Sequence, residues 1–156
     1  MSIELASKRD VLVNYGTRVT GRAAGIVKTE GANNELVIDL TGQILTDLIV
    51  FPVVVPSGSI FTGEARLVVS EAFNLAVGTV VEVGQQGSEV TNGVSLTEAE
   101  LESTGTKDVS AGLAGEWAIT SELSTDHTID IALSAGSVTS STVGKAQLIL
   151  EYIKLA

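Results

Sequence analysis

The final third of the chain alternates apolar and polar residues with a period of two. In the segment HTIDIALS, Ile129, Ile131 and Leu133 are separated by polar or small residues, and the segment GKAQLILEY repeats the pattern with Leu148 and Leu150. Such alternation places apolar side chains on one face of a strand and polar side chains on the other. We therefore predict two amphipathic strands here, joined as a hairpin by the small, polar loop AGSVTSSTVG.

From Glu35 onward, short runs of strand-forming residues are separated by turn signals. ELVIDL is followed by a turn at Thr41-Gly42, and residues 43–56 (QILTDLIVFPVVVP) predict a strand that is buried on both faces or lies at an edge because of Pro52. About seven to nine short strands of this kind are typical of two packed sheets. We predict an all-β fold, an antiparallel β-sandwich that is jelly-roll-like.

Two segments of the body carry further local signals. The segment SLTEAELEST favours a single helical turn, with Ser95 or Thr97 as the N-cap and acidic residues in the first turn. In EWAITSEL, Trp117 and Ile119 share one parity, so we predict a strand that places Trp117 in the core.

The N-terminal region has a different pattern. Gly16, Gly21, Gly25 and Gly31 recur at intervals of four to six residues. Glycines at this frequency cost backbone entropy in any helix or strand. We therefore expect an extended N-terminal arm over residues 1–34 and a β-sandwich body over residues 35–156.

The charge of the chain is divided between these regions. Residues 1–28, called here the basic segment, hold five basic residues against Glu4 and Asp10 and carry a formal charge of +3, whereas the remaining 128 residues carry −13. The five basic residues are Lys8, Arg9, Arg18, Arg22 and Lys28. A basic, glycine-bearing segment attached to an acidic body predicts a docking element that binds a partner.

The composition argues against several classes of function. Without cysteine there is no disulfide, thiol nucleophile or thiolate metal site. Nucleic-acid binding needs a concentrated positive surface, but the basic residues beyond position 28 are scattered, so we expect no nucleic-acid partner. The apolar run Leu48 to Pro56 is nine residues long and too short to span a bilayer, which takes roughly 20 helical residues. MSIELASKRD lacks the apolar stretch of a signal peptide, so we expect no export and no membrane association.

No arrangement of residues suited to catalysis stands out. His127 is the only histidine, and it lies in the turn-like segment STDHTID, so we expect it to be a surface residue of a turn. Zinc needs three or four converging ligands, and the spacing of Asp126 and Asp130 matches no calcium loop. We therefore expect no catalytic residue, no metal site and no cofactor.

Three segments together carry a resemblance to a known class of proteins. They are NYGTRVTGRAAGIVKTEGANNELVID, VVVPSGSIFTGEARLVVSEAFNLAVGT and TVGKAQLILEYI. Together they resemble the small structural proteins of tailed bacteriophages that decorate or cement the capsid. The resemblance implies a β-rich body on the outside of the shell and an N-terminal segment along the lattice of the major capsid protein.

The function that we expect follows from this resemblance. The protein would be a virion structural protein, made in the host cytoplasm, that binds the capsid exterior and bridges capsomers through its arm. Its partners would be the major capsid protein and further copies of itself, with a trimer preferred. Tyr15 would be an amphipathic anchor, and the basic residues would pair with capsid carboxylates. The expected capsid-interaction residues are Arg9, Tyr15, Arg18, Arg22 and Lys28.

Three further points stay open at this stage. The segment Leu48 to Val55 is either part of the core or a candidate subunit interface. An alternative function is a ligand- or receptor-recognition module of a phage tail fibre, such as a carbohydrate-binding sandwich, with loops 84–93, 103–115 and 134–144 at its binding end. The aromatic content of 4% argues against sugar binding. An internal head or neck component would share the same fold.

Overall fold

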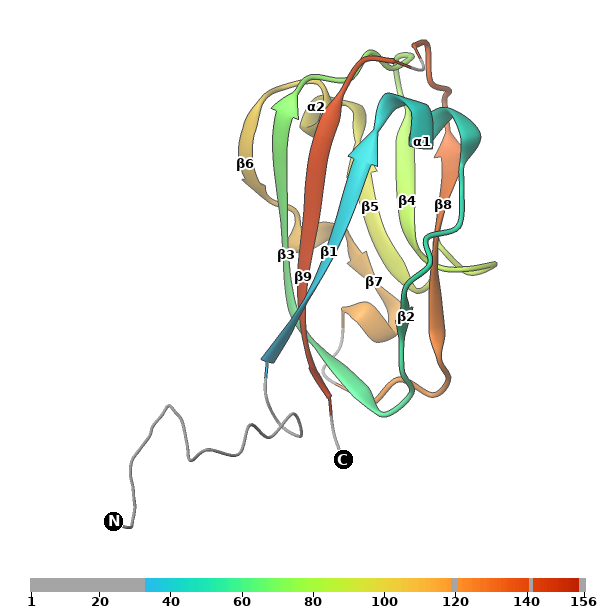
Figure 1. Ribbon diagram of the computed structural model, residues 1–156, viewed down its shortest axis with the longest axis vertical. Helices are drawn as coiled ribbons and strands as arrows, with labels where there is room; N and C mark the ends of the chain where they lie inside the picture. The colour runs from blue at the N-terminus through green and yellow to red at the C-terminus, as the bar shows by residue number, and fades with distance from the viewer. Residues whose placement is uncertain (1–32, 119–120, 141, 155–156) are drawn as a thin grey trace, which may run out of the picture. The chain divides into compact units, whose positions relative to one another are not determined.

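Two antiparallel β-sheets pack face to face in the computed structural model, which describes residues 33–118, 121–140 and 142–154 (Figure 1). The first sheet has the strand order β1-β9-β3-β6 and the second has the order β2-β8-β4-β5-β7. The strands of the first sheet are β1 (Asn33–Thr41), β3 (Ser59–Glu71), β6 (Gly105–Asp108) and β9 (Lys145–Lys154). Those of the second are β2 (Val54–Val55), β4 (Val80–Gln85), β5 (Gly93–Thr97), β7 (Leu113–Ala114) and β8 (His127–Ala135).

The connections make this sandwich a jelly roll. The chain changes sheet on each step from β1 to β4, and β5 stays in the second sheet. It then crosses to the first sheet for β6, returns to the second for β7 and β8, and ends in the first with β9. All pairings within both sheets are antiparallel. The predicted all-β, jelly-roll-like antiparallel sandwich is therefore confirmed. Of the predicted arm over residues 1–34, residues 1–32 lie outside the described part of the chain, and Asn33 and Asn34 begin β1.

The predicted hairpin between the last two strands is wrong. β8 pairs with β2 and β4 in the second sheet, whereas β9 pairs with β1 and β3 in the first. Alternation specifies which face of a strand is buried, but it does not specify the neighbouring strand. Sheets in a sandwich pack about 10 Å apart, and the connection at residues 136–144 is long enough to cross that distance.

The predicted strand at residues 43–56 is also wrong over its first half, where the chain forms helix α1 (Gly42–Asp47). Thr41 is its N-cap, and the side-chain oxygen of Thr41 accepts a hydrogen bond from the backbone N–H of Ile44 over 3.2 Å. The helix ends at Leu48, whose φ of +53° lies in the left-handed region. The strand that follows, β2, has only two residues.

The short helix predicted in SLTEAELEST is confirmed as α2 (Glu98–Leu101). Thr97 is its N-cap and forms a capping box with Glu100, because each side chain accepts a hydrogen bond from the other's backbone N–H. The strand predicted in EWAITSEL is wrong over its described part, because residues Gly115–Trp117 form a 3₁₀ turn (η2) that follows a similar turn, η1 (Ser110–Gly112).

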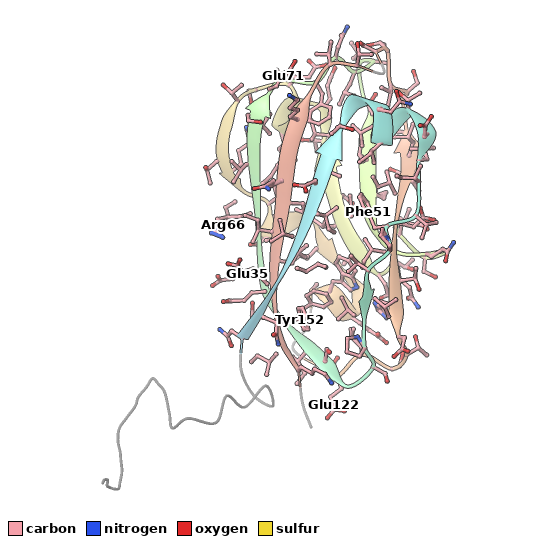
Figure 2. The ribbon with its side chains drawn as sticks, in the orientation of Figure 1. Glu35, Phe51, Arg66, Glu71, Glu122 and Tyr152 are labelled. Carbon is pink, nitrogen blue, oxygen red and sulfur yellow. The ribbon has the colours of Figure 1, made fainter. Side chains whose placement is uncertain are left out.

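The core fills the space between the two sheets (Figure 2). Alternate residues of each strand supply it, so that Ala65, Leu67 and Val69 of β3 are buried as their parity predicts. Trp117 is 0% exposed and stacks on Phe61 with ring centroids 4.7 Å apart, which confirms its predicted core position. Burying one such large apolar side chain contributes about 1.5–3 kcal/mol, so this layer is the main source of stability.

Candidate functional site

The five residues predicted to contact a capsid all precede β1. Because the structure describes the chain from Asn33, their positions lie outside the described residues. They are Arg9, Tyr15, Arg18, Arg22 and Lys28. The binding surfaces that can be described are therefore those of the sandwich.

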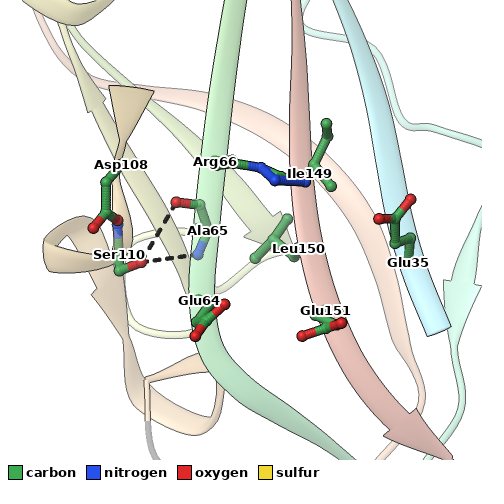
Figure 3. Close-up of a pocket in the computed structure, with 9 residues that line it drawn as sticks. All are labelled: Glu35, Glu64, Ala65, Arg66, Asp108, Ser110, Ile149, Leu150 and Glu151. Atoms are coloured by element: carbon green, nitrogen blue, oxygen red, sulfur yellow. Dashed lines mark hydrogen bonds between the residues drawn. The ribbon is translucent and has the colours of Figure 1, made fainter. Parts of the chain in front are cut away.

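A hollow of about 530 Å³ lies on the outer face of the first sheet (Figure 3). Residues of β1, β3, β6 and β9 and the first residue of η1 line it. These residues are Glu35, Glu64, Ala65, Arg66, Asp108, Ser110, Ile149, Leu150 and Glu151. The sequence places them in four separate segments, so no local pattern could reveal the hollow.

A bulge in β3 shapes this hollow. Phe61 pairs with Tyr152 and Ala65 pairs with Leu150, so that residues 62–64 together lie opposite Glu151. Such an insertion bends the strand and changes the direction of its side chains. Gly63, within the bulge, has a φ of +88°, a conformation that side-chain-bearing residues rarely adopt. The bulge therefore places Glu64 and Glu151 on adjacent strands at the same level of the sheet.

Ser110 lies on the opposite side of the hollow, where it is hydrogen-bonded to the backbone of β3. Its hydroxyl accepts a hydrogen bond from the backbone N–H of Ala65 over 2.9 Å and donates one to the carbonyl oxygen of Ala65 over 3.4 Å. The backbone N–H of Ser110 donates to Asp108 over 2.9 Å. Hydrogen bonding from the Ser110 side chain, and then from its backbone, lowers the pKa of Asp108. Asp108 is therefore negatively charged at neutral pH.

The hollow is electronegative. Four carboxylates and the guanidinium of Arg66 give it a formal charge of −3. Glu151 accepts a hydrogen bond from the side-chain amide of Asn33 over 3.2 Å. Among the described residues, Glu35, Glu64 and Arg66 make no side-chain hydrogen bond or ion pair. The hollow therefore has a net negative charge.

Catalysis is not supported by this arrangement. The Ser110 hydroxyl already bonds both backbone groups of Ala65 and has no histidine beside it among the lining residues. Within residues 33–118, 121–140 and 142–154, no group of three or more histidine or acidic side chains is placed to hold a metal ion. Neither helix of the described residues is long and apolar enough to cross a membrane.

His127 is buried, so its predicted place in a surface turn is wrong. It is the first residue of β8, and its side chain is 0% exposed. The indole N–H of Trp117 donates a hydrogen bond to Nδ1 of His127 over 2.8 Å. The polar residues before His127 suggested a turn, but its parity with Ile129 and Ile131 was the available signal of burial.

The hydrogen bond from Trp117 decides the tautomer of His127. Because Nδ1 accepts, the proton of the neutral ring lies on Nε2. Nε2 lies 3.2 Å from Oε1 of Glu116, in a geometry that falls short of a directed hydrogen bond. Burial lowers the pKa of His127, and the charge of Glu116 only partly opposes this effect.

Glu116 also contacts Ser124, whose hydroxyl donates to Oε2 over 2.8 Å. This hydrogen bond lowers the pKa of Glu116. In a catalytic triad the serine hydroxyl donates to the histidine, whereas here it donates to the carboxylate. Two hydrogen-bonded pairs, Trp117 with His127 and Ser124 with Glu116, therefore meet at the contact between His127 and Glu116.

Glu82 is a second buried polar residue. It alternates with Val81 and Val83 in the sequence, a pattern that predicts an exposed side chain. It lies on β4 and is 2% exposed. Its two carboxylate oxygens accept hydrogen bonds from the hydroxyls of Ser95 over 2.6 Å and Ser134 over 2.8 Å. The two serines come from the strands on either side of β4, so the carboxylate joins three strands.

The segment Leu48 to Val55 is only partly in the core, where Val55 is buried and Phe51 and Val53 pack against the core residues. Leu48, Ile49, Val50 and Val54 are between 36% and 52% exposed, whereas Val55 is buried. Its role as a subunit interface remains a prediction.

The loops predicted to form one binding end of a recognition module do not all lie together. Val80 pairs with Ala135 and Gln85 pairs with Ile129, so β4 and β8 run in opposite directions. The loop that follows β4 and the loop that follows β8 therefore lie at opposite ends of the sandwich (Figure 1). A single binding end made from loops 84–93, 103–115 and 134–144 is not formed.

Comparison with known proteins gives a structural likeness. No family model matches the chain, and no curated protein matches it in sequence. A chain in the capsid of Ralstonia phage GP4 aligns with a TM-score of 0.53 and 16% identity, over 84% of this chain and 90% of that chain. A chain in the acidic stable capsid structure of Helicobacter pylori bacteriophage KHP30 aligns with a TM-score of 0.50 and 14% identity, over 81% of this chain and 91% of that one.

These alignments span most of the chain on both sides, so they concern the whole sandwich rather than a fragment. At this level of identity the likeness shows the fold. The class that the fold defines is a two-sheet jelly roll of the kind present in phage capsid structures.

Proposed function

We propose that this protein is a virion structural protein that binds the outer surface of a phage capsid and stabilises the shell by bridging capsomers through its N-terminal arm. The observation that carries the proposal is the jelly-roll fold shared with chains of two phage capsids. The charge distribution supports the mode of binding, because the basic segment carries +3 and the rest of the chain carries −13.

The major capsid protein is the proposed partner of the arm. The guanidinium groups of Arg9, Arg18 and Arg22 would form bidentate pairs with capsid carboxylates, with Lys28 as a further positive charge. Tyr15 would bury its ring and keep its hydroxyl hydrogen-bonded. Many copies binding one shell would act together, so each single contact could be weak.

The sandwich serves as a rigid body in this proposal. Two buried polar side chains, His127 and Glu82, accept hydrogen bonds from other side chains of the fold. The exposed apolar residues of the segment Leu48 to Val55 are the proposed subunit interface of a closed cyclic homo-oligomer, preferably a trimer.

Binding to capsids assembled without this protein tests the proposal. The full-length protein should sediment with such capsids, and R9Q/R18Q/R22Q should bind at least about tenfold more weakly, since each lost charge-assisted contact costs about 1 kcal/mol. The matched control K107Q/K145Q/K154Q removes three positive charges from the described body and should bind like the unaltered protein.

Electron microscopy of the virus particle is a second test of the proposed function. The proposal requires density for this protein on the outside of the shell. Density on the tail would instead support the recognition module, and density inside the shell would support an internal component. Equal loss of binding in the control variant would show that the arm has no special role.

A further inference from the structure

We propose that the electronegative hollow on the first sheet binds the basic segment of a second copy of this protein. The inference rests on the proposed function for the docking role of that segment, and it adds a second partner besides the capsid. Neighbouring copies would then be tied to one another as well as to the shell.

The hollow and the basic segment have opposite charges. The hollow has a formal charge of −3, while the basic segment has a formal charge of +3. Glu35 and Glu64 have no side-chain partner among the described residues, so a guanidinium can pair with them without breaking an existing bond. Arginine, which supplies three of the five basic residues, forms bidentate pairs with carboxylates.

The hollow also has an apolar part. Ile149 lies between Val37 on β1 and Arg66 on β3 in the register of the sheet. Val37 is 43% exposed, although it lies in the middle of a strand. The hydrocarbon stem of an arginine or lysine can cover such a surface while its charged end reaches a carboxylate. The outer face of the first sheet therefore offers both kinds of contact that a basic, extended peptide needs.

The proposed occupant is the segment of a second copy. Pairing between copies would link neighbours to one another, whereas pairing within one copy would leave them unlinked. The cross-linking experiment below distinguishes these two arrangements.

One segment can serve both partners because of its length. From Lys8 to Lys28 an extended chain spans up to roughly 70 Å, which is longer than a hollow made by four adjacent strands about 5 Å apart. Part of the segment can therefore lie in a neighbour's hollow while another part contacts the capsid.

Self-association of the full-length protein in solution, without capsids, tests this inference. We expect sedimentation equilibrium to show association that weakens as salt rises, because exposed charge pairs are screened. E35Q/E64Q should weaken it about tenfold, as two ion pairs of the usual exposed strength would predict. Neither substitution removes a described hydrogen bond, so folding should be preserved.

The control E71Q/E122Q removes the same charge elsewhere. Figure 2 shows Glu71 near one end of the molecule and Glu122 near the other. This variant should associate like the unaltered protein. Association that is insensitive to E35Q/E64Q, or equally reduced by both variants, would overturn the inference, as would a protein that stays monomeric at low salt.

A zero-length carbodiimide cross-link identifies the occupant. An equimolar mixture of ¹⁴N- and ¹⁵N-labelled protein should give peptides that join Lys8 or Lys28 of one label to Glu35, Glu64 or Glu151 of the other. Cross-links confined to a single label would place the segment in its own copy and contradict the inference. Because no capsid is present, either result leaves the capsid-binding test of the proposed function independent.

Discussion

The indole N–H of Trp117 donates to Nδ1 of His127 over 2.8 Å, and both side chains are 0% exposed. The bond satisfies two polar groups that would otherwise be buried without partners. It also makes the neutral form of His127 a requirement of the folded state, because a proton on Nδ1 would remove the acceptor.

Stability should therefore fall as the pH drops below about 6.5. The pKa of His127 is lowered in the folded state by burial, so the unfolded chain binds more protons between the folded and unfolded pKa values. Stability is fully present above the unfolded pKa and is lost at up to about 1.4 kcal/mol per pH unit as the pH falls toward the folded pKa. Urea denaturation at a series of pH values from 8 to 5 measures this slope.

The variant H127Q is the control for that experiment. It removes the titrating ring, so its slope over the same pH range should be much smaller. The pKa of Glu116 is also lowered in the folded state, from 4.5. Glu116 therefore affects stability at a lower pH than His127 does, because its contribution is lost as the pH falls below 4.5 through its folded pKa. An unchanged slope in H127Q would show that other groups cause the acid sensitivity.

Trp117→Phe should destabilise the protein by about 1–3 kcal/mol through loss of the donor, because it leaves Nδ1 of His127 buried without a partner. The double variant W117F/H127F removes both polar groups and should recover part of that loss. Thermal and urea unfolding of the unaltered protein, W117F, H127F and the double variant measures the difference. A double variant whose loss equals the sum of the two single losses would argue against this coupling.

Glu82→Ala should cost about 1–3 kcal/mol, because the hydroxyls of Ser95 and Ser134 lose their common buried acceptor. The control E122A changes an exposed carboxylate and should stay within about 0.5 kcal/mol of the unaltered protein. Urea unfolding at pH 7 measures both. Similar losses in the two variants would show that Glu82 has no special structural role.

The exposed segment after α1 permits a test of the proposed subunit interface. I49S/V50S should leave the free energy of unfolding of the isolated subunit within about 0.5 kcal/mol, since both side chains are more than two-fifths exposed. If these residues form the interface, the variant should have a smaller mass by light scattering. The matched control V77S/V90S changes two exposed valines in other loops and should keep the oligomeric state. Loss of the oligomer in both variants would contradict a specific interface.

The core strands and α2 were predictable because their signals are local. Alternating residues identify the buried faces of β3 and β9, and Thr97 with Glu100 supplies a capping box within a single turn. Trp117 was correctly assigned to the core, although it lies in a 3₁₀ turn and not in the strand whose parity suggested its burial. The start of α1 was missed because the apolar run after Gln43 suits a strand as well as a helix, and Thr41 acts as a cap only once the chain has turned.

Neighbours in space depend on the whole chain. Period-two alternation in β8 and β9 fits a hairpin and a crossing between sheets equally well, and the competition among all strands for partners decided in favour of the crossing. The burial of His127 depends on Trp117 reaching it from another segment. The hollow exists because strand pairing places Glu35 opposite Glu151 and the bulge in β3 places Glu64 beside Glu151. Local patterning is a property of adjacent residues, whereas a surface built from distant strands follows from the free energy of packing the entire sandwich.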